Sequence, residues 1–478
     1  MKNYLFKKTI SEQTITKILN ENKIQIVIGH PTYKNEDNIV DLIKKDIIGL
    51  NSNFDKTNAA IIISDGTFNS QSKDLSIYNQ IKDNLEDLNL SEYVSLIYTP
   101  YENYRGNKIP GKGSALYLIF NEFYNAKDTE FLFLFDGDIR NDISQWLSAY
   151  IKVIKHFETN FRKQDKLFVT AKYARHFVDA SLTRFVVSPL TTLMAKFVPG
   201  GISGDILLNK QAVALEISAE WNENRFKYGT DISTTFDNIY NGSIIYEVYL
   251  GAKLHDITDE SKLSIMPGEV IGAALERLLY YQKQSNFLSF LLESEKPLGY
   301  PIIFDSVASN IPFIDPGYTD VFNIEYKIKS LIEKFSEFAP LLEKTISNDD
   351  FTRLTNKIKK LKDYSKNATN EILFIDMNFD WYRELIYQIM GYLLKTEDID
   401  ISKKAFQYLY SGAFLEFCRN IFFKLGYKTY EDVIKNQNHL GVPKKQAKDF
   451  YNIEVDKKIA DFAAKFYEEK YKIKKYME

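Results

Sequence analysis

The sequence predicts an α/β fold, with a mostly parallel sheet in the first half of the chain and a mainly helical region in the last third. Five short runs rich in Ile, Val, Leu and Phe occupy residues 24–29, 59–64, 94–99, 131–135 and 167–171. Continuous apolar runs of this kind are typical of parallel strands that are buried on both faces. Helical stretches separate the runs, at 38–48, 76–87 and 114–124. Strand and helix in alternation predict a layered α/β domain.

The pattern changes near residue 270. Proline and glycine punctuate the segment 297–317, which is typical of a connection. Beyond it, apolar residues follow helical spacing from Val321 to Phe335 and again from Trp381 to Leu393. We therefore predict an α/β domain over 1–275, a connecting segment over 276–320 and a mainly helical C-terminal region over 321–478.

Composition narrows the class of protein. The net charge is −3, from 61 basic and 64 acidic residues, without the clustered basic face that a nucleic-acid partner needs. The one cysteine, Cys418, fits a reducing compartment and is typical of a small buried apolar residue. The first residues do not form a signal peptide, and the longest apolar-leaning run, 185–198, is too short and too polar to span a bilayer. We expect a cytoplasmic protein with no membrane segment and no nucleic-acid partner.

Two carboxylates follow the fourth apolar run directly. Asp136 and Asp138 are separated only by Gly137, so both can face one cation at the end of a buried strand. Mg²⁺ and Mn²⁺ prefer oxygen ligands and often share them with a substrate diphosphate. A turn or a helix N-cap is the alternative, because Asp favours both. The position after a buried strand favours the metal site.

A glycine-rich segment opens the helix after the third run. Gly111 and Gly113 free the backbone, Lys112 adds a positive charge, and a helix N-terminus favours an anion. The spacing is neither that of a Walker loop nor that of a dinucleotide-binding loop. An ordinary turn with a helix cap explains this segment equally well.

Further polar loops follow the other strands. The segments 31–36 and 64–66 stand where a nucleotide would lie across the sheet edge. A glycine-dense loop covers 198–205, and His255 closes a strand-like stretch, where it could serve as a nitrogen ligand. A lone histidine is more often a satisfied core or surface residue, and we expect this of the other four, which are His30, His156, His176 and His439.

Eight motifs between residues 24 and 260 occur in an order that resembles a known family. They are Pro31 to Glu36, Ser64 to Gly66, Gly111 to Leu116, Asp136 to Asp138, Arg184 to Leu190, Gly200 to Gly204, Tyr228 to Asp231, and Leu250 to His255. The series resembles the GT-A fold glycosyltransferases, and among them the glucosyl-3-phosphoglycerate synthases and mannosylglycerate synthases. The resemblance covers about half of the chain. It implies that 1–275 is a nucleotide-sugar-binding and catalytic domain with a Rossmann-like mixed sheet.

The resemblance also implies a retaining, metal-dependent transfer and a role for each matched residue. The metal, Mg²⁺ or Mn²⁺, would be held by Asp136, Asp138 and His255. The nucleotide would be held by Pro31, Thr32, Tyr33, Glu36, Ser64, Asp65, Lys112 and Asp136. The sugar and the acceptor would contact Arg184, Gly201, Ser203, Tyr228 and Asp231. The catalytic residues would be Asp231, Lys112 and Asp138, with Asp231 positioning the sugar.

The sequence departs from the family around the acceptor. Arg184 is kept, but Val186 and Ile257 stand where the enzymes that act on phosphoglycerate have polar residues. The loss of two polar groups favours free glycerate or a glucosylglycerate-type acceptor over a phosphorylated one. We expect a hexosyltransferase that moves glucose or mannose from a nucleotide diphosphate sugar to glycerate, 3-phosphoglycerate or a related small acceptor, making a compatible solute. UDP-glucose is the favoured donor, and GDP-mannose stays open.

Other classes are weighed against this expectation. A mannosyltransferase acting on a glucosylglycerate-type acceptor would carry out the same kind of sugar transfer with a different acceptor. A sugar nucleotidyltransferase would carry a Gly-rich, Arg-containing signature where this chain has 30–36. A non-catalytic GT-A scaffold has no reason to retain Lys112, Asp136, Asp138 and His255 together. A lipid or polysaccharide acceptor is disfavoured because no membrane anchor is seen. A homodimer would suit the aromatic helical region.

Overall fold

The computed structural model describes residues 2–54, 56–175, 180–255, 260–304, 324–366, 373, 375–424, 426–429, 431–432 and 455–478. The chain forms two compact units, and each is built from separate stretches of sequence. The sheet unit comprises Met1–Tyr173, Gly200–Asp256 and Pro301–Ile314, and the helical unit comprises Ala174–Pro199, Ile257–Tyr300 and Asp315–Glu478. The division of the chain at residues 275 and 320 stays a prediction.

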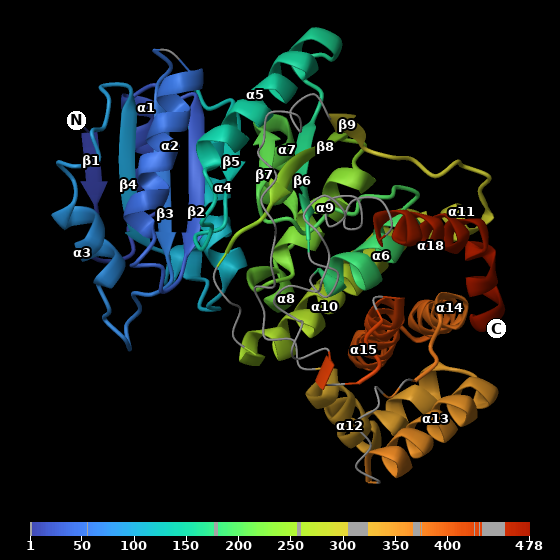
Figure 1. Ribbon diagram of the computed structural model, residues 1–478. Coiled ribbons are helices and arrows are strands. Elements are labelled where there is room, and N and C mark those ends of the chain that lie inside the picture. Colours follow the sequence, from blue (N-terminus) through green and yellow to red (C-terminus); the bar gives the residue numbers. More distant parts are fainter. Residues whose placement is uncertain are drawn as a thin grey trace. The chain divides into compact units, whose positions relative to one another are not determined.

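The described part of the sheet unit is organised around a nine-stranded sheet in the order β1-β4-β3-β2-β5-β7-β6-β8-β9 (Figure 1). Its strands are β1 Lys2–Leu5, β2 Ile26–Thr32, β3 Ala59–Asp65, β4 Val94–Pro100, β5 Phe131–Leu134, β6 Leu167–Ala174, β7 Ile206–Asn209, β8 Ile244–Ala252 and β9 Ile302–Phe304. Strands β1 to β5 pair in parallel, whereas β7 runs antiparallel to both β5 and β6. The predicted class, α/β with a Rossmann-like mixed sheet, is confirmed.

Burial on both faces explains why the central strands read as continuous apolar runs. Every residue of β3 and of β4 is buried. Strand β2 stands between β3 and β5, with Ile26 opposite Ala59 on one side and Phe131 on the other. Each of the five predicted runs forms a strand, because a strand covered on both faces needs apolar side chains in both directions.

Helices cover the two faces of this sheet. On one face, α2 (Ile39–Asn53), α3 (Ser76–Asp83) and α5 (Ile143–Asn160) share a core with β2 to β5. On the other face, α4 (Lys112–Asn125) packs on β2 and β3, and α1 (Thr14–Glu21) packs on α4. The approach of α4 is close, because a Cβ on Gly29 would lie 3.0 Å from the side chain of Ile119. Figure 1 shows these helices beside the strands.

The remaining helices complete the two units. Within the sheet unit they are η1 Tyr104–Gly106, α7 Lys210–Ser218, α8 Glu223–Phe226 and α9 Thr230–Tyr240. Within the helical unit they are η2 Thr183–Val187, α6 Ser188–Leu193, α10 Glu260–Ser285, α11 Phe287–Glu293, α12 Ile324–Thr345, α13 Asn348–Lys366, α14 Phe379–Thr396, α15 Ile399–Lys424, α18 Asp456–Glu468 and η5 Lys470–Tyr476. The mainly helical character of the C-terminal region is confirmed. None of the helices in the described ranges has the length and hydropathy that crossing a membrane requires.

Aromatic rings fill the core of the helical unit. Phe185 of η2 packs against Tyr382 of α14, and Tyr382 stacks on Phe462 of α18. The hydroxyl of Tyr382 donates to the Phe185 carbonyl at 2.7 Å, so this polar group is satisfied inside the core. Cys418 is buried, as predicted. The predicted helical position Val321 lies outside the described residues, as do Ile257, His176 and His439.

A buried carboxylate holds the start of α1 against α4. Glu122 of α4 accepts hydrogen bonds from the backbone N–H groups of Gln13 and Thr16, at 2.9 and 2.6 Å. It also accepts the hydroxyl of Tyr104 at 2.7 Å. The side chain thus satisfies N-terminal donors of α1 that the helix itself leaves without partners.

We predict that Glu122→Ala lowers the free energy of unfolding by about 2–3 kcal/mol, because the buried donors of Thr16 and Tyr104 lose a charged acceptor. Denaturant unfolding of the purified protein measures this. Glu21→Ala is the matched control, since the ion pair of Glu21 with Lys17 is long and exposed and its loss should change stability by less than about 0.5 kcal/mol. Equal effects of the two substitutions would contradict the role assigned to Glu122.

Candidate active site

Polar loops meet at the carboxyl edge of the parallel strands. Thr32 ends β2 and stands opposite Asp65, which ends β3, while Asp136 follows β5 closely. Ligands of open α/β sheets bind at this edge, because loops from neighbouring strands converge there. The structure therefore brings three of the predicted loops together, as their positions after the strands led us to expect.

The loops after β2 and β3 form one wall. The N–H of Lys34 donates to the hydroxyl of Thr67 at 2.7 Å, which ties the two loops to each other. Asp65 is turned inward: it accepts the Tyr98 hydroxyl and the Thr67 N–H, at 2.7 and 2.8 Å, and burial raises its pKa. The carboxylate of Asp65 is thus already used in hydrogen bonds within this wall. Its predicted contact with the nucleotide stays a prediction.

Other predicted nucleotide residues in this wall are accessible or lack a partner. The ring of Tyr33 is 48% exposed. The Oε2 atom of Glu36 and the hydroxyl of Ser64 are buried and have no hydrogen-bond partner within the described residues. Buried polar atoms without partners are costly, so they mark a place where a ligand or water would be accommodated.

The glycine-rich segment at the start of α4 is fixed from both sides. The N–H of Gly111 donates to the hydroxyl of Tyr101 at 3.0 Å, and burial raises the pKa of this tyrosine to about 12. The N–H of Gly113 donates to the carbonyl of Lys227 at 3.1 Å. A Cβ on Gly113 would lie 2.0 Å from the carbonyl oxygen of Arg225, so only glycine fits. Lys112 stands between them, at the first residue of the helix.

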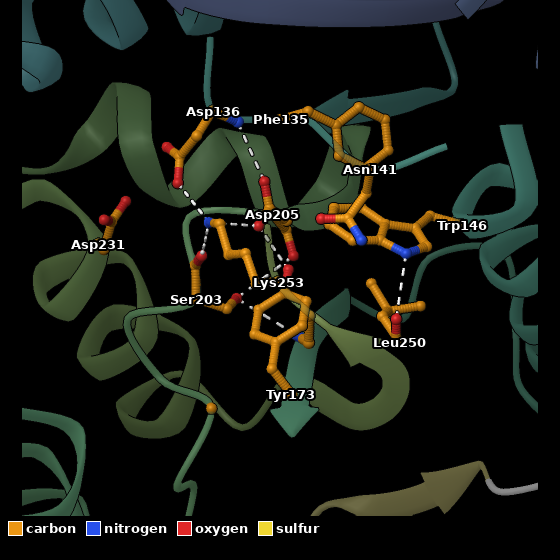
Figure 2. Close-up of polar contacts among 12 residues, drawn as sticks. Phe135, Asp136, Asn141, Trp146, Tyr173, Ser203, Asp205, Asp231, Leu250 and Lys253 are labelled. Carbon is orange, nitrogen blue, oxygen red and sulfur yellow. Dashed lines mark hydrogen bonds and ion pairs between the residues drawn. The ribbon is translucent and has the colours of Figure 1, made fainter. Parts of the chain in front are cut away.

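Five charged side chains form an alternating series that we call the ion chain, Asp231–Lys112–Asp136–Lys253–Asp205. The Lys112 ammonium lies 2.9 Å from Asp231 and 2.7 Å from Asp136. The Lys253 ammonium lies 2.6 Å from both Asp136 and Asp205. Figure 2 shows Lys253 between these two carboxylates. The backbone N–H of Asp136 also donates to Asp205 at 3.0 Å.

Pairing determines the protonation of the ion chain. Burial alone would lower the pKa of Lys112, but Asp136 and Asp231 raise it well above its usual value. Burial would raise the pKa of Asp136, but the two lysines lower it strongly, so Asp136 is ionised. At the two ends of the ion chain, burial raises the pKa of Asp231 and of Asp205. The single lysine that each of these carboxylates contacts lowers the pKa but does not cancel the rise. The site therefore keeps two ammonium groups in a buried place by surrounding them with carboxylates.

The glycine-dense loop packs directly on the ion chain. Gly204 has a φ of +76°, which favours glycine, and a Cβ there would lie 2.4 Å from an oxygen of Asp136. The carbonyl of Ser203 accepts the Lys253 ammonium at 3.0 Å, and the carbonyl of Gly201 accepts the Thr235 hydroxyl at 2.6 Å. Gly201 and Ser203 thus lie in the same cluster as the ion chain.

The loop after β5 is clamped to the end of β8. Asn141 donates to the carbonyl of Ala252 at 2.8 Å and accepts the N–H of Leu254 at 2.7 Å. An antiparallel bridge pairs Ile139 with His255. The backbone carrying Asp138 and the backbone carrying His255 are therefore held side by side, although more than a hundred residues separate them in the sequence.

This arrangement fits a divalent metal at Asp138 and His255 better than at Asp136. Both oxygens of Asp136 accept lysine ammonium groups. Within the described ranges, no three His, Cys, Asp or Glu side chains gather closely enough to hold a metal ion by themselves. Mg²⁺ commonly takes only one or two protein ligands and completes its shell with phosphate oxygens and water. Asp138 and His255, on neighbouring backbone segments, match that number of protein ligands, and their role as metal ligands stays a prediction.

Some predicted residues are placed and others stay predictions. Tyr228 lies in the turn before α9, and Asp231 lies in the first turn of that helix. Arg184 is buried in the helical unit, so its contact with the acceptor stays a prediction. His30 is a satisfied core residue, as expected, because its Nε2 lies 2.6 Å from Asp46.

No role was predicted for Lys253, Asp205, Tyr173 or Asn141. Lys253 lies two residues before His255, and Asp205 ends the glycine-dense loop, so both stand inside segments that had been singled out. Tyr173 donates its hydroxyl to Asp205, and its ring lies 5.5 Å from the Lys253 ammonium. The role of Lys253 could have been suspected from the sequence, because a lysine at the buried end of an apolar strand needs a partner of opposite charge.

Comparisons with known proteins find similarity among solved structures. No protein-family model matches the chain, and no curated protein does. One similar structure is glucosyl-3-phosphoglycerate synthase from Mycobacterium tuberculosis in complex with Mn²⁺, UDP and glucosyl-3-phosphoglycerate, with 18% identity, coverage of 58% of this chain and 87% of that one, and a TM-score of 0.38. The same enzyme with Mn²⁺, UDP-glucose and glycerol 3-phosphate matches at 17% identity, the same coverage and a TM-score of 0.38. The likeness is one of fold.

We predict that Lys253→Met lowers the free energy of unfolding by about 3–5 kcal/mol at pH 7.5, because it leaves Asp205 buried without its counter-ion. Burial raises the pKa of Asp205, and loss of the lysine removes the group that opposes this rise. An acid whose folded pKa is raised destabilises the fold as pH increases above its unfolded pKa. The deficit of the variant should therefore be smaller at pH 5 than at pH 7.5, as measured by denaturant unfolding.

The double variant Lys253→Met/Asp205→Asn provides the control. Removing both charges should recover a large part of the lost stability, because no buried carboxylate is then left unpaired. A deficit that is independent of pH and unchanged by Asp205→Asn would mean that Lys253 contributes packing rather than charge.

Proposed function

We propose that the chain is a hexosyltransferase that takes a sugar from a nucleotide diphosphate donor and transfers it to a hydroxyl of a small acceptor. One observation carries the proposal: Lys112, in the first turn of α4, is held between Asp136 and Asp231 at the carboxyl edge of the sheet. A helix N-terminus attracts anions and disfavours a cation, so a lysine there is best explained by an anion that binds beside it. Asp136 and Asp231 supply negative charge while a diphosphate is absent.

The wall formed by the loops after β2 and β3 suits the nucleoside part of the donor. The exposed ring of Tyr33 offers a face on which a base can stack. Glu36 supplies a buried carboxylate oxygen that has no hydrogen-bond partner among the described residues and can accept a hydrogen bond from a ribose hydroxyl. Pro31, Thr32 and Ser64 line the same edge and are assigned to the nucleotide with them.

Asp138 and His255 would hold a Mg²⁺ or Mn²⁺ ion, which, when bound, stabilises the charge of a leaving diphosphate as a Lewis acid. The clamp by Asn141 fixes the backbone of both residues before any ligand arrives. Lys112 and Lys253 together keep Asp136 ionised, and Lys253 also holds this carboxylate in place beside Lys112. Asp136 is thereby assigned to orienting the lysine more than to binding a metal.

The proposed transfer retains the configuration of the sugar. The bond from C1 to the leaving phosphate oxygen breaks as the acceptor oxygen bonds to C1 on the same face. The acceptor proton passes to the leaving phosphate oxygen. Lys112 donates hydrogen bonds to the developing phosphate charge, and Asp231 positions the sugar hydroxyls and stabilises positive charge at C1.

For substrates, we propose UDP-glucose or GDP-mannose as donor and glycerate, 3-phosphoglycerate or a glucosylglycerate-type compound as acceptor. Each of these acceptors carries a carboxylate, which suits a basic residue. Arg184 is the arginine of the family's acceptor motif that this chain keeps. The absence of polar side chains at Val186 and Ile257 favours a non-phosphorylated acceptor.

We predict acceptor-dependent release of nucleoside diphosphate when the protein is incubated with Mg²⁺ or Mn²⁺, a nucleotide sugar and each acceptor. Lys112→Met and Asp231→Asn should each lower kcat by about 10²–10³-fold, because each removes a group that stabilises the transition state. Asp138→Ala and His255→Ala should raise the metal concentration needed for half-maximal rate. Coupled release of UDP or GDP is the measurement.

Asp37→Asn serves as the control, because Asp37 is an exposed acid near the same edge that pairs only with Arg140 among the described side chains. It should leave the rate within about twofold of wild type. Turnover that persists in Lys112→Met, or no turnover together with no binding of any nucleotide sugar, would contradict the proposed function.

A further inference from the structure

The helical unit contains a cavity of about 510 Å³. None of the residues that line this cavity belongs to the ion chain. It is lined by the end of α11, the segment 294–300, α18 and η5. Its apolar lining comes from Leu292, Leu298 and Ala464. A cavity of this size accommodates a small metabolite.

A buried lysine lines this cavity, and no carboxylate of the described residues pairs with it. Lys470 is only 7% exposed, and its ammonium contacts the carbonyl of Ser294 at 3.2 Å and the ring of Tyr467 at 3.7 Å. Burial lowers its pKa. Two other lysines of η5 do have carboxylate partners: Lys472 pairs with Glu469, and Lys474 pairs with Glu293. A buried ammonium with donors to spare is stabilised when an anion binds beside it.

Further positive charge lies nearby. Lys296 lines the cavity, and its carbonyl accepts the Tyr467 hydroxyl at 2.7 Å, which fixes the segment 294–300 against α18. Lys196 is partly buried, and its pKa is lowered first by burial and then by the charge of Lys296. The two lysines repel each other, and a bound anion would relieve this repulsion.

The mouth of the cavity has a different character. Tyr300 and Tyr471 are 56% and 58% exposed, so their rings are available to a ligand. Glu295 and Glu468 also line the cavity and are exposed. These carboxylates repel a second anionic group but accept hydrogen bonds from hydroxyls. The ligand that suits the whole cavity therefore carries one anionic group toward Lys470 and hydroxyls toward the mouth.

We propose that this cavity binds a small hydroxylated oxyanion, either a sugar phosphate or a sugar acid, with the phosphate or carboxylate on Lys470. The site does not depend on the transferase activity proposed above, and its ligand need not be a substrate. Lys470 provides charge-assisted hydrogen bonds, Lys296 adds attraction, and the two tyrosines cover the sugar.

Isothermal titration at constant ionic strength tests this with three probes: glucose 6-phosphate, glucuronate and neutral glucose. The Lys112→Met protein is used throughout, so that anion binding at the ion chain is weakened in every arm. We expect saturable one-to-one binding of at least one anionic probe and none of glucose. The anionic probe that binds more tightly tells whether phosphate or carboxylate is preferred.

Lys470→Met should weaken that binding at least tenfold, whereas Lys470→Arg should keep it within about threefold. Lys475→Met is the matched control, because Lys475 is an exposed lysine of the same turn that lies over Tyr476 outside the cavity lining. Lys296→Met and Tyr471→Ala are surface substitutions that cannot unfold a buried core, and each should weaken binding about three- to tenfold. Circular dichroism establishes that each variant is folded.

The proposal is overturned if neither anion binds, or if glucose binds equally well. It is also overturned if the anionic probe binds with the same affinity to the wild-type cavity and to the Lys470→Met and Lys296→Met variants. In those cases Lys470 only satisfies the Ser294 carbonyl. Because nucleoside diphosphate release is assayed separately, failure here leaves the proposed transferase function unaffected, and loss of transferase activity leaves this site unaffected.

Discussion

The pairing of Lys253 with Asp136 and Asp205 is the interaction on which the rest of the candidate site depends. Asp205 is fully buried, and a buried carboxylate without a counter-ion would either take up a proton or open the structure. Lys253 opposes both, and Lys112 and Lys253 together lower the pKa of Asp136, which is therefore ionised. Asp136 can then hold Lys112 at the start of α4. The pairing of Lys253 with Asp136 thus helps to fix the position of Lys112, the proposed phosphate-binding lysine, whose charge Asp136 and Asp231 maintain.

The sheet makes this pairing possible by bringing distant segments to one edge. Asp136 follows β5, Asp205 precedes β7, and Lys253 follows β8. The antiparallel placement of β7 beside β5 puts the glycine-dense loop over Asp136, where Gly204 leaves room for the carboxylate. Loops positioned by a rigid scaffold are the usual place for chemistry. Here a fixed network of charges adds precision that loops alone would lack.

Much of the fold could be predicted from the sequence, because central strands buried on both faces leave continuous apolar runs. The edge strands β1 and β9 could not, since short, partly exposed strands lack that pattern. For the site, Lys112, Asp136 and Asp231 were singled out, and the structure brings their side chains into contact. Lys253 and Asp205 were missed, because their roles follow from the order of β5, β7, β6 and β8 in space. Helix α10 also begins near residue 260, before the predicted change of character.

The most direct test of the account is a crystal structure with UDP and Mn²⁺, using the anomalous signal of the metal to locate it. The account predicts a manganese peak within coordination distance of Asp138 and His255, and the diphosphate within hydrogen-bonding distance of Lys112. It also predicts that Lys253 still joins Asp136 to Asp205. A nucleotide bound elsewhere, or a manganese ion that displaces Lys253 from Asp136, would contradict the assignment of the ion chain as the support of a diphosphate site.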